Sequence, residues 1–201
     1  MLFNLKMFKY IFVFTILFFS VNIYAKEYRS IFGFTANIPN TFIVITSLNH
    51  ADSINRLEER GYDSSVLVEL LEDIKYKKNL ETIVDISGHE SESFNFNEVE
   101  NESIINDSYL KELCPYVPEL FADMAKKYVH QYSCKMIKIK NLPSDVVYML
   151  HDSLYSVDNL MIQYQFYLKE KQYLTFSGEC LKKNCKEIQK IMEQILLSIR
   201  M

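Results

Sequence analysis

The densest group of chemistry-bearing residues in this 201-residue chain is His151-Asp152-Ser153. A hydrolase triad uses these three residue types: the serine attacks, the histidine takes its proton and the aspartate orients the histidine. Triads are assembled from distant positions, whereas these residues are sequence neighbours. We interpret the group as a turn after a strand. The sequence also contains no G-x-S-x-G nucleophile elbow, no P-loop and no dinucleotide-binding fingerprint.

The histidines do not form a metal-binding pattern. None lies four residues from another, the spacing that puts two ligands on one face of a helix. His89 stands beside Glu90 and near Glu92, where it could chelate a metal weakly, but a solvated loop histidine is the favoured interpretation. We therefore predict no catalytic, metal or cofactor site. The four histidines are His50, His89, His130 and His151.

The cysteines number four, and an even count in an exported chain predicts two disulfides. Four cysteines allow three connectivities, of which we favour the local one, Cys114–Cys134 with Cys180–Cys185. Zinc binding and redox chemistry are the alternatives. The spacings of 20, 46 and 5 residues contain no C-x-x-C pair, which both alternatives commonly use.

The first 25 residues have the pattern of a secretory signal peptide. Lys6 and Lys9 form a basic start, residues 10–21 are uncharged and apolar, and Ala25 precedes a charged segment. We expect cleavage after Ala25, which leaves residues 26–201 as one exported domain, periplasmic or secreted. The alternative is an uncleaved N-terminal anchor, although residues 10–25 fall short of the roughly 20 that a spanning helix needs.

Charge excludes some partners. Without Lys6 and Lys9, the domain keeps 20 of the 22 basic residues against 26 acidic ones, a net charge of −6. Nucleic-acid binders usually carry a basic patch, so we expect no nucleic-acid partner. The domain offers no polybasic attraction to anionic lipid, so we also expect no membrane contact after cleavage.

Local patterns in the first half predict short strands and two helices. Residues 30–35 and 41–45 are rich in strand formers, and 81–87 forms a third run. A helix is expected over 51–60, ending at Gly61, and an amphipathic helix over 63–75.

The middle of the chain is harder to assign. Residues 88–106 are polar and acidic, and we expect a loop or an edge hairpin there. Two glycosylation sequons, at Asn101 and Asn106, matter only in a eukaryotic host. Asp107 is the predicted N-cap of the next helix, with a break or kink expected near 114–118 because of two prolines.

The last third predicts an antiparallel meander and a closing helix. Apolar residues alternate with others around residues 137–139, 146–150, 162–168 and 173–176. An apolar stripe from Ile188 to Ile199 follows a capping-box pair, Asn184 and Glu187. We therefore predict an α+β domain in which helices flank an antiparallel sheet.

Both ends of the exported part resemble PsbP-like (Mog/PsbP) domains. The segment Ile31-Phe32-Gly33-Phe34-Thr35-Ala36-Asn37-Ile38-Pro39 is similar to the first hairpin of that family. The segment 173–178, with the helix that ends at 195–199, is similar to its last strand and helix. The resemblance implies an antiparallel sheet between helices. It also implies non-enzymatic roles, since known members are an extrinsic photosystem II subunit and a Ran-binding protein.

The predicted function is that of an exported, non-catalytic binding or accessory protein that acts through contacts with a protein partner. The export signal, the missing catalytic motifs and the PsbP-like ends motivate this hypothesis. A secreted hydrolase with scattered catalytic residues is the first alternative. A small-molecule or lipid carrier with an aromatic pocket is the second.

Overall fold

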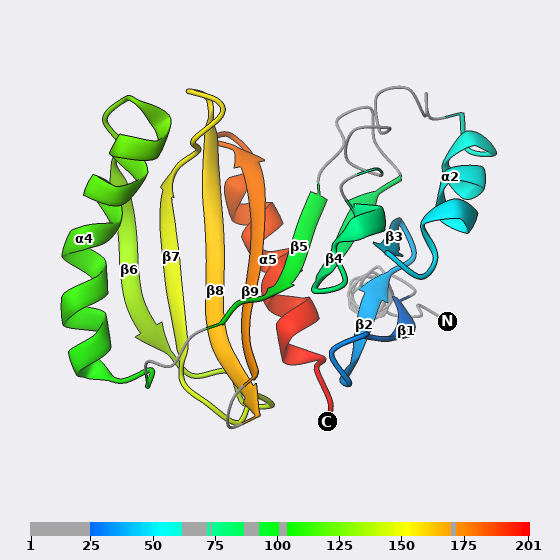
Figure 1. Ribbon diagram of the computed structural model, residues 1–201, viewed down its shortest axis with the longest axis horizontal. Coiled ribbons are helices and arrows are strands. Elements are labelled where there is room, and N and C mark those ends of the chain that lie inside the picture. Colours follow the sequence, from blue (N-terminus) through cyan, green and yellow to red (C-terminus); the bar gives the residue numbers. More distant parts are fainter. Residues whose placement is uncertain (1–24, 62–71, 73, 87–92, 101–103, 170–171) are drawn as a thin grey trace, which may run out of the picture.

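A seven-stranded antiparallel sheet forms the centre of the molecule (Figure 1). The computed structural model describes residues 25–61, 72, 74–86, 93–100, 104–169 and 172–201. The strands are β3 (Phe42–Thr46), β4 (Leu80–Asp85), β5 (Ser93–Glu98), β6 (Gln131–Ile137), β7 (Val146–Asp152), β8 (Asn159–Lys169) and β9 (Gln172–Leu181). Their spatial order is β3-β4-β5-β9-β8-β7-β6. The predicted meander is confirmed as the run from β6 to β9, and the predicted α+β class is confirmed with it.

A small hairpin and the described helices flank this sheet. The hairpin pairs β1 (Ala25–Arg29) with β2 (Thr35–Pro39), and the helices are α2 (His50–Glu58), α4 (Asp107–Ala125) and α5 (Cys185–Leu197). The helix α5 and the hairpin pack on one face, in the main core. On the opposite face, α2 packs at the β3–β4 end and α4 at the β6–β7 end.

The main core follows from strict alternation along the central strands. In β8 every second residue is buried, and these residues face α5. Aromatic rings fill the space, with Phe96 stacked on Phe176 at a centroid distance of 4.1 Å. Gly178 is required in β9, because a Cβ there would lie 2.6 Å from Cδ1 of Phe94.

The prediction of a loop or edge hairpin at 88–106 was wrong. Residues Ser93–Glu98 form β5, which lies between β4 and β9 inside the sheet. Phe94 and Phe96 are fully buried, while Asn95 and Asn97 lie on the other face, which no described helix covers at this point. Polar residues on that open face made a central strand resemble a surface segment.

Of the break or kink predicted at 114–118, the break is absent, because α4 is one continuous helix with Pro115 and Pro118 inside it. Packing of its inner face against β7 and a bond from Cys114 to β6 offset the lost backbone hydrogen bonds. The N-cap is Asn106 rather than Asp107, since the Asn106 side chain accepts from the Tyr109 amide at 2.9 Å.

Other boundaries differ in smaller ways. Residues 30–34 form the tight turn between β1 and β2, where Gly33 has a φ of 87°, instead of the predicted strand. The expected helix over 51–60 is confirmed as α2, and most of the helix expected over 63–75 lies outside the described residues. Asn184 caps α5 by position, but its side chain makes no capping hydrogen bond.

The four cysteines are joined in the local pairing. Cys114 meets Cys134 with a Cα–Cα distance of 5.7 Å, and Cys180 meets Cys185 at 5.0 Å. The first bridge ties α4 to β6, the edge strand. The second closes the turn between β9 and α5. The two disulfides thereby fix α4 and α5 to the sheet at one point each.

A buried carboxylate holds the N-terminal hairpin on the sheet. Glu81 in β4 is completely buried and accepts hydrogen bonds from the Tyr28 hydroxyl at 2.8 Å, the Ser30 hydroxyl at 2.9 Å and the Ile31 amide at 2.6 Å. Burial raises the pKa of Glu81, and the three hydrogen bonds oppose that rise. All three donors belong to one short segment of chain, so this carboxylate positions the whole hairpin.

Removal of this carboxylate should be costly. Glu81→Ala leaves one buried and two half-buried donors without their acceptor and is expected to lower the free energy of unfolding by about 3 kcal/mol. Tyr28→Phe removes one donor and should cost about 1 kcal/mol. Urea unfolding measures both changes, with the exposed Glu58→Ala as the control. A loss in Glu81→Ala no larger than in the control would show that the hairpin is held in another way.

Candidate functional site

The middle of the sheet carries a polar surface between α2 and α4. Here β5, β9 and β8 present half-buried uncharged side chains in cross-strand register. One row runs from Asn95 through Ser177 to Gln163, and the next from Asn97 through Thr175 to Gln165. We call these six residues the polar floor. Such side chains can donate and accept hydrogen bonds, but they carry no group that titrates near neutral pH.

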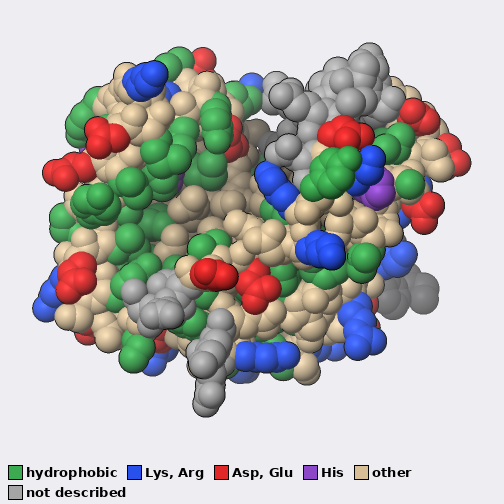
Figure 2. All heavy atoms as spheres, viewed as in Figure 1, with side chains coloured by type: hydrophobic (Ala, Val, Ile, Leu, Met, Phe, Trp, Pro, Cys, Tyr) green, Lys and Arg blue, Asp and Glu red, His purple; other side chains and the backbone are tan. Residues whose placement is uncertain are grey.

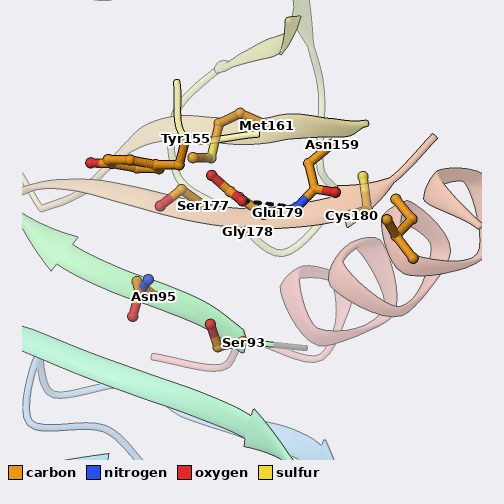
Figure 3. Close-up of a pocket in the computed structure, with 10 residues that line it drawn as sticks. Ser93, Asn95, Tyr155, Asn159, Met161, Ser177, Gly178, Glu179 and Cys180 are labelled. Carbon is orange, nitrogen blue, oxygen red and sulfur yellow. Dashed lines mark hydrogen bonds between the residues drawn. The ribbon is translucent and has the colours of Figure 1, made fainter. Parts of the chain in front are cut away.

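A cavity of about 530 Å³ adjoins this floor at the end near the β7–β8 loop (Figure 3). Glu179 is the only carboxylate among its described lining residues. Its two oxygens accept from the Ser153 hydroxyl at 2.6 Å and the Asn159 amide at 3.2 Å. The carboxylate thus holds the β7–β8 loop in place, and the described lining places no second acid or histidine beside it for acid–base work.

The candidate triad does not assemble. Nδ1 of His151 lies 2.8 Å from the backbone oxygen of Asp152, and the Ser153 hydroxyl donates to Glu179 instead of to the histidine. The Asp152 carboxylate accepts from the His130 amide and the Tyr132 hydroxyl and pairs with Lys182 at 3.3 Å. The prediction of a turn at these three residues was wrong for two of them, because His151 and Asp152 are the last residues of β7 and only Ser153 follows the strand.

His151 is the structural partner of α4. Its ring is buried and stacks on Phe121, with the centroids 4.4 Å apart. Burial lowers the pKa of His151, against opposing effects of the Asp152 backbone and the Asp152 and Glu179 charges. Because the Asp152 carbonyl can only accept, Nδ1 carries the proton in the neutral ring. A neutral imidazole thus lies under the last third of the helix.

The outer side of α4 exposes an apolar row. Tyr116, Leu120 and Met124 follow one another at four-residue steps and are 56%, 40% and 63% exposed. Tyr128, just beyond the helix, is 79% exposed. Figure 2 shows apolar side chains gathered over α4 and toward the middle of this face. We call Tyr116, Leu120 and Met124 the α4 row.

The disulfide fixes the direction of this row. Cys114 points to the edge strand β6 and Val117 packs onto β7, so the flank that contains Tyr116 lies on the other side of the helix. Tyr109 belongs to that flank. It lies near Tyr167 of β8, whose pKa is raised by burial and further by Tyr109. The α4 row therefore borders the polar floor.

The remaining predicted candidates do not converge. His50 caps its own turn through the Ser47 carbonyl, and His130 is exposed between Tyr128 and Tyr132. His89, with Glu90 and Glu92, lies outside the described residues. Among the residues that are described, no three potential ligands come together to hold a metal ion. No helix in the same part of the chain is long and apolar enough to span a membrane.

Comparisons with known proteins identify the fold. No protein-family model and no curated protein matches the sequence. The solved structure of cyanobacterial PsbP (CyanoP) from Synechocystis sp. PCC 6803 superposes with a TM-score of 0.57 at 9% identity, over 90% of this chain and 95% of that chain. The Ran-binding protein Mog1p from Saccharomyces cerevisiae gives 0.47 at 10% identity, over 88% and 90%. The superposition on CyanoP shows that the chain has the PsbP-like fold, which confirms the predicted resemblance.

The buried histidine should make stability depend on pH. Unfolded, His151 titrates at about 6.5, and in the folded protein its pKa is lower, so the folded state binds fewer protons between these values. The free energy of unfolding should therefore fall as the pH drops below about 6.5, by at most about 1.4 kcal/mol per pH unit.

Urea unfolding at several pH values between about 5 and 8 measures this slope. We expect His151→Gln to be less sensitive to acid than the wild type, and the exposed His130→Gln to match the wild type. An unchanged slope in His151→Gln would mean that other groups carry the acid sensitivity.

Proposed function

We propose that the chain is an exported, non-catalytic accessory protein that binds a protein partner through the exposed side of α4. The single observation that carries this proposal is the α4 row, three large apolar side chains in line on a helix that is bonded to the sheet. Single exposed apolar residues are ordinary on protein surfaces. A contiguous apolar group beside a polar surface is typical of a protein-binding site.

The local chemistry also favours binding over catalysis. His151 and Ser153 hold α4 and the β7–β8 loop in place. The polar floor next to the α4 row supplies neutral hydrogen-bonding groups, which suits a contact surface with an apolar centre and a polar rim. A partner that covers the row would bury its aromatic and aliphatic side chains and could hydrogen-bond to the floor.

Two features support export. Two disulfides within one small domain are typical of an oxidising compartment. The first described strand begins at Ala25, so cleavage after that residue would keep Lys26–Arg29 paired with β2. The Tyr28 hydroxyl would then still bind Glu81.

Site-specific photo-crosslinking in cells tests both parts of the proposal. A photoreactive phenylalanine analogue replaces Tyr116 in one strain and Tyr76 in another. Tyr76 is the matched control, because it is an exposed tyrosine in a different part of the molecule. We expect a discrete protein adduct from position 116 and none from position 76. Mass spectrometry of that adduct should find an N-terminal peptide that starts at Lys26.

The outcomes separate the two parts. An adduct from both positions, or from neither, contradicts partner binding through α4. An adduct whose peptide map includes Met1 contradicts cleavage and indicates that the N-terminal segment is retained as an anchor.

A further inference from the structure

The solvent side of the α4 row is acidic. Glu112, Glu119 and Asp123 are exposed and lie three or four residues from members of the row, so their side chains run alongside it. We call these three residues the acidic ridge. The described structure shows no ion pair between the ridge and any Lys or Arg. Of the basic residues nearest in sequence to the ridge, Lys111 lies on the opposite flank of α4, and Lys126 and Lys127 come after the helix.

This arrangement is unfavourable for the isolated helix. Glu119 and Asp123 are like charges four residues apart, which repel on a helix surface. The last turn of α4 contains Asp123 but no basic residue, although the negative end of the helix dipole favours cations there. A nearby positive charge from another molecule would relieve both effects.

The described structure also holds the surface in a fixed shape. The Cys114–Cys134 bond and the stack of Phe121 on His151 hold the helix to the sheet. The C-cap Lys126, directly after the helix, has the left-handed conformation at a φ of 50°. A partner therefore meets a surface that is already formed, which lowers the entropic cost of binding.

From this charge pattern we infer that the partner presents a basic amphipathic helix to α4. Its apolar side would pack on Tyr116, Leu120 and Met124, and its Lys or Arg side chains would lie against the acidic ridge. An apolar row beside a line of carboxylates is complementary to apolar residues at helical spacing flanked by cations. This inference rests on the proposed function and adds the chemical class of the partner.

Two model peptides of about 18 residues test the inference. Both form amphipathic helices with a leucine face, and the polar face is all lysine in one and all glutamate in the other. Fluorescence anisotropy of the labelled peptides measures their dissociation constants for the purified exported protein. We expect the leucine–lysine peptide to bind at least about tenfold more tightly. Its affinity should fall as salt is raised, because salt screens exposed charges.

Variants separate charge from apolar contact. The triple variant Glu112→Lys/Glu119→Lys/Asp123→Lys should reverse the preference between the peptides. The control variant Glu27→Lys/Glu58→Lys/Glu59→Lys makes the same change in net charge at exposed positions elsewhere and should keep the wild-type preference. Leu120→Ser should weaken binding of the leucine–lysine peptide while leaving the fold intact, because Leu120 is exposed.

Three results would overturn the inference. They are equal binding of both peptides, the same loss of preference in the control variant, and self-association of the protein that Leu120→Ser abolishes. If the charge-reversed variant fails to fold, the salt dependence of the wild type decides alone, and salt-insensitive binding contradicts the inference. An adduct at position 116 together with equal peptide binding would leave the proposed function standing and refute only the basic partner.

Discussion

The packing of α5 on the centre of the sheet is the interaction on which the remaining structure depends. The inner residues of β5, β9 and β8 meet Ile188, Met192 and Ile195 of the helix in one core. The bond between Cys180 and Cys185 begins the helix next to β9, and Gly178 leaves room for Phe94 to lie against that strand. Because this single face buries the large aromatic residues, the opposite face of the same strands can be polar.

The open face of the sheet follows from that division. Its two ends are covered by α2 and α4, each with a small apolar cluster of its own, and its middle carries the polar floor. The helix α4 needs extra attachment because its cluster is small, and the disulfide to β6 and the stack on His151 supply it. The attachment uses one side of the helix. The α4 row lies on the other side, next to the polar floor, and the acidic ridge lies on the solvent side of the row.

Much of the fold could be predicted from local patterns, and the misses concern which neighbours lie against a segment in the folded chain. Strict alternation identified β8 and part of β9, and the spacing of Ile188 to Ile199 identified α5, because each buries a continuous apolar side. The strand β5 was missed because Asn95 and Asn97 face the open side of the sheet. The exposure of Tyr116 and Leu120 could not be foreseen, since a four-residue apolar step looks the same whether a sheet covers it or not. The Glu81 contacts join residues 50 and more positions apart, and only a charged residue within an apolar strand hinted at them.

Methionine methyl NMR tests the central claim, that α4 presents a preformed binding surface, most directly. Met124 lies in the α4 row, Met201 is similarly exposed at 61% but far along the chain, and Met192 is buried under the sheet. On titration with the leucine–lysine helical peptide, the Met124 methyl signal should shift progressively to saturation while those of Met201 and Met192 stay in place. A shift of Met201 as large as that of Met124, or an unmoved Met124 signal at saturating peptide, would contradict the account.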